Sequence, residues 1–266
     1  MSAQIKELIE LADLDELSLL FATIWGRAEE PPLNNDILKA LAISRNYVAG
    51  AYVNGRLAGG LVGWLGGTPP DDLHMHSHIL GVLPGSEQKG LGFELKQHQR
   101  RWCLDRGVRV MEWTTDPLVR RNVYFNLTKL GAEAPEYLVN FYGEMRDGIN
   151  AGEESDRLLI RWRLDSQRAE AAAGGALHEP DAETLERWNA DAILVAGPRG
   201  EPVVTAARSR VLLCRVPDDI VALRRQDPAL ARAWRLALRE AITRAIDRGY
   251  AITGATRSGW YVLEST

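Results

Sequence analysis

The stretch best suited to bind a ligand is residues 78–92, which read HILGVLPGSEQKGLG. Its apolar first half predicts the end of a strand, and the residues after Gly90 predict a helix. Glycines at the start of a helix let the backbone approach a ligand and leave several N–H groups pointing one way. These donors and the positive helix end suit a phosphate or pyrophosphate. The spacing is neither the Gly-x-Gly-x-x-Gly of dinucleotide folds nor the Gly-Lys-Ser/Thr of a Walker loop.

Three of the five histidines, His74, His76 and His78, alternate along the strand that leads into this loop. On a strand they share one face at a spacing of about 6.8 Å. One metal ion could reach two of them but hardly all three, and no cysteine or acidic cluster supplies the rest, so we predict no metal site. Histidine is a natural base near neutral pH. Two interpretations stay open: a catalytic base, or polar residues on a partly wet strand face. Glu112, on the following strand, is a rival base, with a solvated or salt-bridged glutamate as its alternative.

The elements that must position these residues follow from periodicity and turn signals. Up to residue 164 we expect, in chain order, a strand at 5–12, helices at 13–25 and from 35 or 36 to 43, strands at 47–53, 57–65 and 75–83, a helix at 91–105, a strand at 108–115, a helix from 116 to 131, and strands at 137–142 and 158–164. Asn54-Gly55 between two apolar runs is a hairpin signal. Asp116-Pro117 supplies an N-cap and a proline for the first helical position.

The best domain boundary is the Ala/Gly/Glu-rich text at 165–180. We therefore predict a domain at 1–165, a linker at 166–181 and a smaller α+β domain at 182–266. In the last part we expect a helix at 182–189, strands at 192–196 and 211–216, a helix at 228–248, and strands at 250–253 and 260–264. Strand, helix and strand at 211–253 repeat the order at 75–115, which leaves a degenerate second copy open.

Composition narrows the classes of partner. The 266 residues carry a net charge of −4, which makes a nucleic acid a poor partner. Cys103 and Cys214 cannot build a disulfide framework, which suits a reducing compartment. No run approaches 18 apolar residues, and the first residues lack a basic segment followed by an apolar one. We expect a cytoplasmic protein with no membrane contact.

With its flanks, the 78–92 stretch resembles the acyl-CoA-binding motif of the GNAT superfamily of N-acyltransferases, Val-x-Pro-x-x-Arg/Gln-x-x-Gly-x-Gly/Ala. Val82, Pro84, Gly90 and Gly92 match, whereas Glu87 stands where the family prefers Arg or Gln. The resemblance extends over residues 5–164 in the order of elements. It also includes the WTTDPL text at 113–118, Arg121-Asn122 and Leu130-Gly131.

The resemblance implies an α/β (α+β) fold with a mixed, splayed central sheet, and acetyl-CoA or another acyl-CoA as co-substrate, with no metal. The thioester arm would pair with the backbone around 80–82. The residues implied in binding are Leu80, Gly81, Val82, Glu87, Gln88, Lys89, Gly90, Leu91, Gly92, Asn122 and Asn126. In the arylalkylamine branch a His-x-His pair at the places of His76 and His78 takes the amine proton through water. The candidate catalytic residues are therefore His78 and His76, with Glu112 as the rival base.

One departure concerns the acid that protonates the leaving thiolate. Many relatives place a tyrosine four residues before the helix-ending glycine, and this count gives Leu127 here. Either the acid comes from elsewhere, with Tyr137 and Tyr142 as candidates, or the thiolate leaves without one. The implied function is transfer of an acetyl or succinyl group to a primary amine of a small molecule such as an amino acid. A non-catalytic CoA-binding regulatory module is the alternative, and a homodimer stays open.

Overall fold

The computed structural model describes residues 3–27, 29–68, 72–86, 90–143 and 154–265. It divides the chain into two compact units, Met1–Trp113 with Arg163–Asp165, and Thr114–Trp162 with Ser166–Thr266. These cuts differ in position from the predicted domain boundary near residue 165, and the division into domains at 1–165 and 182–266 stays a prediction.

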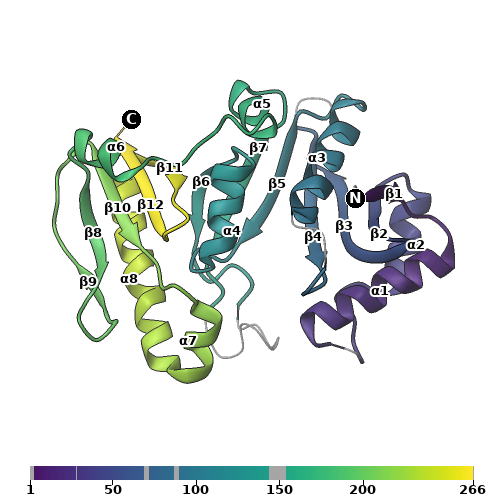
Figure 1. Ribbon diagram of the computed structural model, residues 1–266, viewed down its shortest axis with the longest axis horizontal. Coiled ribbons are helices and arrows are strands. Elements are labelled where there is room, and N and C mark those ends of the chain that lie inside the picture. Colours follow the sequence, from purple (N-terminus) through teal and green to yellow (C-terminus); the bar gives the residue numbers. More distant parts are fainter. Residues whose placement is uncertain (1–2, 28, 69–71, 87–89, 144–153, 266) are drawn as a thin grey trace. The chain divides into compact units, whose positions relative to one another are not determined.

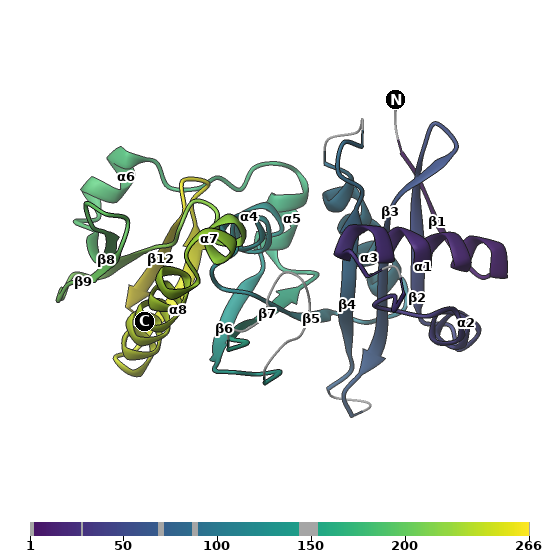
Figure 2. The same ribbon diagram turned by 90° about the horizontal axis from the view of Figure 1, so that it is seen from below.

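Unit 1 is a sheet with helices on both faces (Figure 1). Its elements are β1 (Gln4–Glu7), α1 (Leu11–Trp25), α2 (Asn35–Ile43), β2 (Tyr47–Val53), β3 (Arg56–Gly66), β4 (His74–Val82), α3 (Leu91–Leu104) and the start of β5 (Val110–Thr115). The strand order is β1-β2-β3-β4-β5, with β4 and β5 parallel and the other neighbours antiparallel. Figure 2 shows α1 crossing the strands, which it contacts at β3 and β4.

Alternation along the strands divides the core of unit 1 in two. Val48 and Val62 pack against Leu17 and Phe21 of α1. On the other face, the Tyr47 ring lies edge-on to Trp102 of α3, with centroids 5.5 Å apart. The predicted hairpin is confirmed: its turn residues Asn54 and Gly55 both have positive φ, 52° and 76°, as a two-residue turn between twisted strands requires.

Within unit 2 the strands follow the order β7-β6-β11-β12-β10-β8-β9. Its elements are α4 (Arg120–Tyr124), the π-helix η1 (Phe125–Lys129), β6 (Glu133–Leu138), β7 (Arg157–Arg163), α5 (Gln167–Ala173), α6 (Ala182–Arg187), β8 (Asp191–Ala196), β9 (Pro202–Val204), β10 (Val211–Arg215), α7 (Ile220–Gln226), α8 (Pro228–Asp247), β11 (Tyr250–Ala255) and β12 (Trp260–Ser265). The long helix α8 contacts β6, β8, β9, β10 and β11.

The second copy of 75–115 that the sequence left open does not have the strand pairing of the first. In unit 1, β4 and β5 are parallel neighbours, but β10 and β11 are separated by β12, to which both are antiparallel. What recurs within unit 2 is a helix followed by an antiparallel hairpin: η1 with β6–β7, and α8 with β11–β12. The first strands of the two hairpins, β6 and β11, pair antiparallel at Ala134 and Ile252. The two hairpins are therefore neighbours that run in opposite directions.

Two local predictions also need correction. The helix expected from Asp116 begins only at Arg120, because an Asp116 carboxylate oxygen instead accepts the Leu118 amide at 2.9 Å in a turn. The predicted linker contains the helix α5, which Ser166 caps at its N-terminus. From this helix Arg168 donates to the carbonyl oxygens of Leu127 at 3.1 Å and Thr253 at 2.8 Å, so α5 belongs to the packed part of unit 2. Strand β9 and helix α7 were not predicted.

Buried charge fixes the Asp116 turn. The second Asp116 oxygen accepts from Arg224 at 2.7 Å and from Arg235 at 3.2 Å, and all three side chains are at most 8% exposed. Burial acts to raise the pKa of Asp116, but Arg235, Arg224 and the Leu118 amide outweigh it and hold that pKa below its ordinary value. A lowered carboxyl pKa means that the folded state gains stability above pH 4 and loses it as the pH falls further.

We expect Asp116→Ala to reduce the free energy of unfolding by about 3 kcal/mol at pH 7, because it leaves two buried guanidiniums without their carboxylate. Denaturant titration at pH 7 and below pH 4 measures this, and the difference from wild type should shrink at the lower pH. Asp165→Ala, which removes a carboxylate from an exposed pair with Arg109, is the control and should change stability little. Equal stabilities of the Asp116 variant and wild type at pH 7 would contradict the account.

Candidate active site

The site in unit 1 begins where two parallel strands part. Strand β4 pairs with β5 only through Met75↔Met111 and His76↔Glu112. It continues to Val82 and keeps its antiparallel ladder with β3 as far as Gly59↔Val82. Among the described residues of unit 1, β4 therefore has no ladder partner on its β5 side from Ser77 to Val82. We call this open edge of β4, residues 77–82, together with the diverging strand β5, the fork. Buried backbone N–H and C=O groups need partners, so the fork can pair with an extended, polar ligand.

The loop after β4 brings a helix terminus to the same end of the strand. Gly90 is the residue before α3 and has a φ of 88°, which favours glycine, and its carbonyl accepts the first helical N–H groups from Phe93 and Glu94. The preceding N–H groups of the first turn have no partner within a helix. The predicted CoA-binding residues Glu87, Gln88 and Lys89 lie outside the described residues.

The predicted residues of the fork have different environments. A Cβ atom at Gly92 would have only ordinary contacts, with Leu80 Cδ2 at 3.8 Å and Val82 Cγ2 at 3.9 Å. In contrast, a Cβ at Gly81 would meet Ile24 Cδ1 at 2.7 Å, so this glycine is needed for packing on α1. Leu91 is buried. Gly92 is thus the position where added bulk tests a ligand rather than the fold.

A β-bulge at His78 arranges the two faces of the fork. Opposite β3, Ser77 pairs with Gly63 and Ile79 with Val62, so His78 is the extra residue on β4. As predicted, His76 and His78 share a face: their ring centroids lie 5.7 Å apart, and both stack near Trp64, at 4.9 and 4.6 Å.

The candidate bases lie on the face of the sheet that carries His76 and His78, which we call the histidine face. Glu112, the ladder partner of His76, lies with an Oε atom 4.0 Å from the Nε2 atom of His74. Desolvation, followed by the charges of His74 and Lys96, lowers the pKa of His76. His78 is exposed on one side, but desolvation by the atoms beneath it and its proximity to His76 also lower its pKa. Both imidazoles are therefore neutral at pH 7 and can accept a proton.

Sequence reasoning missed one residue of the site, Lys96 on α3. It is only 3% exposed, and its Nζ atom donates to Ser77 Oγ at 2.7 Å. A signal was available, because Lys96 lies on the same helix stripe as Gly92, Gln99 and Cys103, at spacings of three and four residues. Lysine is rarely fully buried without a carboxylate.

The other predicted residues belong to unit 2. Asn122 is exposed on α4, whereas Asn126 and Leu127 are buried in η1. The π turn is marked by the bond from Leu130 N to Phe125 O. It adds a residue to the turn, so counting four residues back from Gly131 does not reach the position that the same count reaches in an α-helix. The roles of Asn122 and Asn126 in CoA binding stay predictions.

The two substitute tyrosines are engaged within unit 2. Tyr137 donates to Asp156 at 2.8 Å, and burial and this carboxylate raise the pKa of Tyr137 above its ordinary value. The Tyr142 hydroxyl lies 3.0 Å from Thr114 Oγ1. The Asp156 bond occupies the Tyr137 proton, which makes Tyr137 a poor acid for a thiolate.

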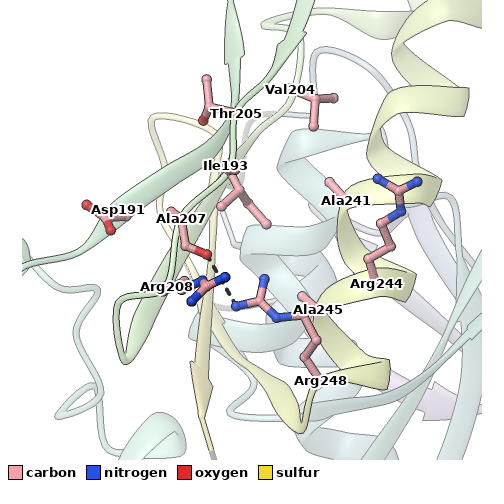
Figure 3. A pocket seen from close by; sticks show the side chains of 11 residues that line it. Asp191, Ile193, Val204, Thr205, Ala207, Arg208, Ala241, Arg244, Ala245 and Arg248 are labelled. Atoms are coloured by element: carbon pink, nitrogen blue, oxygen red, sulfur yellow. Dashed lines mark hydrogen bonds between the residues drawn. The ribbon is translucent and has the colours of Figure 1, made fainter.

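A hollow of about 1010 Å³ in unit 2 is separate from these residues (Figure 3). Arg208, Arg244 and Arg248 line it beside β8 and α8. Arg248 donates to the Ala207 carbonyl at 3.2 Å, and Arg244 pairs with Glu240 at 2.7 Å. The hollow contains none of the predicted catalytic or CoA-binding residues, so its size does not make it the active site.

Comparison with known proteins decides the family. Residues 11–131 match the model of the acetyltransferase (GNAT) family. The chain contains a GNAT acetyltransferase domain. Enzymes of this family are acyl-CoA-dependent N-acetyltransferases with acetyl-CoA as co-substrate, so residues 11–131 form an acyltransferase domain of this type. The predicted family and the α/β class with an open, mixed sheet are confirmed. No curated protein matches the sequence.

Several solved structures resemble the chain. Naa50 of Arabidopsis thaliana, in complex with a bisubstrate analogue, is 18% identical over 60% of this chain and 98% of its own, with a TM-score of 0.48. The ribosomal-protein-S18-alanine N-acetyltransferase of Escherichia coli is 18% identical over 62% and 96%, with a TM-score of 0.48. A GNAT acetyltransferase of Streptococcus pneumoniae is 15% identical over 60% and 98%, with a TM-score of 0.49. At these scores the likeness assigns no substrate.

Two features of the described residues bear on other classes of protein. They contain no group of three or more His, Cys, Asp or Glu side chains that could hold a metal ion. No helix in the described part of the chain is both long and apolar enough to cross a bilayer.

We expect Gly92→Val to weaken acetyl-CoA binding at least tenfold without unfolding the GNAT domain, because its side chain fills the space beside Leu80 and Val82. Isothermal titration calorimetry measures the affinity, and circular dichroism the fold. Gly254→Val is the matched control, since a Cβ at Gly254 of β11 meets nothing within 4 Å. Gly90 is a poorer choice, because its φ of 88° strains any other residue. A folded Gly92→Val protein with wild-type affinity would show that CoA does not use this loop.

Proposed function

We propose that the chain transfers an acetyl or succinyl group from acyl-CoA to the primary amine of a small molecule, such as an amino acid, by direct attack. The observation that carries the proposal is the fork between β4 and β5, with the N-terminus of α3 after the same strand. The helix terminus would bind the pyrophosphate, and the strand edge of 77–82 would pair with the amide-containing arm. The thioester would then lie near the last ladder pair, His76↔Glu112.

The histidine face supplies what an amine acceptor needs. An attacking amine must be uncharged and must lose one proton as the new N–C bond forms. His78 and His76 are neutral at pH 7 because their pKa values are lowered, so either can accept this proton, directly or through water. We assign the role first to His78, which is the more exposed of the two, with His76 and Glu112 as its neighbours on the same face.

The experiment that tests the proposal is a panel of amines with acetyl-CoA and succinyl-CoA, read by release of free thiol. Amino acids and small primary amines should give amine-dependent thiol release. Tight acyl-CoA binding with no thiol release from any amine would favour the alternative, a non-catalytic CoA-binding module. The proposal places the reaction in the cytoplasm, and gel filtration with light scattering tests whether the enzyme is a homodimer.

We expect His78→Ala to lower kcat/KM about 100-fold below pH 8, with acetyl-CoA affinity unchanged, because the base is lost while the CoA loop is intact. The difference should narrow above pH 8, where free amine is supplied without help. Since the pKa of His78 is lowered, wild-type activity should show no acid limb from this residue near pH 6.5.

The matched control is His178→Ala, which removes an exposed histidine of unit 2 and should leave the pH profile unchanged. A His78→Ala enzyme with wild-type rates at every pH would contradict the role of His78 as the base and leave it as a polar surface residue of the strand.

A further inference from the structure

We propose that Lys96 is the acid of the reaction, which donates a proton from its Nζ atom to the CoA sulfur as the thioester bond breaks. This inference rests on the proposed function and supplies an acid in place of the tyrosine that many relatives use.

The first support is the place of the Nζ atom, at the point where the strands part. It lies 2.7 Å from Ser77 Oγ of β4, 3.5 Å from Met111 Sδ of β5, and 3.7 Å from the centroid of the Trp113 ring, also on β5. Met111 is in the first of the two ladder pairs, and Ser77 is the first β4 residue beyond them. The ammonium group thus contacts both strands at the point where they part, next to the place where the thioester would lie.

The second support is that base and acid lie on opposite faces. Side chains alternate along a strand, so Ser77 points away from His76, and Met111 and Trp113 point away from Glu112. The Ser77 and Met111 contacts place Lys96 on the α3 face, opposite the histidines. A thioester carbon between the strands could receive the amine from the histidine face and release sulfur towards Lys96.

The third support is the neutrality of the partners of Lys96. Its hydrogen bonds go to Ser77, to Gln99 Oε1 at 3.5 Å and to Met111, and none of these side chains is charged. The thiol of Cys103, on the same helix, stays protonated because burial raises its pKa to about 12. His76 and Glu112 are on the other face of the sheet. No described carboxylate therefore fixes the ammonium group in a salt bridge.

Burial also makes Lys96 a suitable acid. Desolvation lowers the pKa of Lys96 to about 7, whereas an ordinary thiol has a pKa of about 8.5. Transfer of a proton from Lys96 to the thiolate is therefore downhill, and an ordinary lysine with a pKa of about 10.4 would be the weaker acid of the two.

The step balances as follows. The lone pair of the amine nitrogen forms the N–C bond, the C–S bond breaks, and its electron pair stays on sulfur. The amine proton goes to the base on the histidine face, and the sulfur takes one proton from Lys96. The products are the amide and CoA thiol. The protonated base then releases its proton to solvent, and the neutral Lys96 regains one from solvent when CoA leaves.

The test is Lys96→Met, which removes the ammonium group and keeps the length and apolar stem of the side chain. We expect kcat to fall 10- to 100-fold while the KM for acetyl-CoA changes less than threefold. Wild-type kcat should decline as the pH rises through about 7, because the acid loses its proton, and the variant should lack this decline. Lys39→Met, which removes a half-buried lysine on α2 that donates to the Ile9 carbonyl at 2.8 Å, is the matched control and should behave as wild type.

Each result decides one question. No turnover by the wild type with any amine refutes the proposed function itself. Turnover by a wild type whose kcat does not decline above pH 7, or by a Lys96→Met enzyme with unchanged kcat, overturns the role of Lys96 alone. Acetylation of Lys96 during turnover, seen by peptide mass spectrometry, would show a nucleophile and also overturn it. If the variant fails to fold, the wild-type pH profile still decides.

Discussion

The active site depends on the short ladder between β4 and β5. Two pairs, Met75↔Met111 and His76↔Glu112, hold the strands together, and beyond them β4 pairs only with β3 among the described residues of unit 1. A sheet interior would normally satisfy backbone groups on both sides of a strand. Leaving one side open costs stability unless an extended polar molecule pairs there, which is what the amide-containing arm of CoA provides in our proposal.

The bulge at His78 gives the fork two chemically different faces. Without the extra residue, alternation would put Leu80 and Val82 on the same face as His76. With it, Leu80 and Val82 line the space beside Gly92 of α3, and the imidazoles stay together with Trp64. One face then carries neutral proton acceptors, and the other carries the buried ammonium group of Lys96. The bulge thus places the apolar side chains of Leu80 and Val82 on the opposite face of the strand from the histidines.

Local chemistry was predictable from the sequence, and tertiary pairing was not. The Asn54-Gly55 turn and the strand–loop–helix around Gly90 follow from residues close together in the chain. The bulge depends on how β4 pairs with β3, and the π turn at Phe125–Lys129 has no signal in a residue count. Asp116 could have capped a helix, but buried Arg224 and Arg235 hold its carboxylate. Lys96 could have been noticed on its helix stripe, yet only the packing of α3 shows that it lies beneath the fork.

Hydrogen exchange of β4 tests the central claim most directly, because it reports the strand edge itself. Exchange of the peptide that covers residues 77–82 is compared without ligand, with saturating acetyl-CoA, and with saturating 3′,5′-ADP, which lacks the pantetheine arm. The account predicts slower exchange with acetyl-CoA and little change with 3′,5′-ADP. Saturating acetyl-CoA that leaves exchange of 77–82 unchanged would contradict it, because the arm would then lie outside the fork.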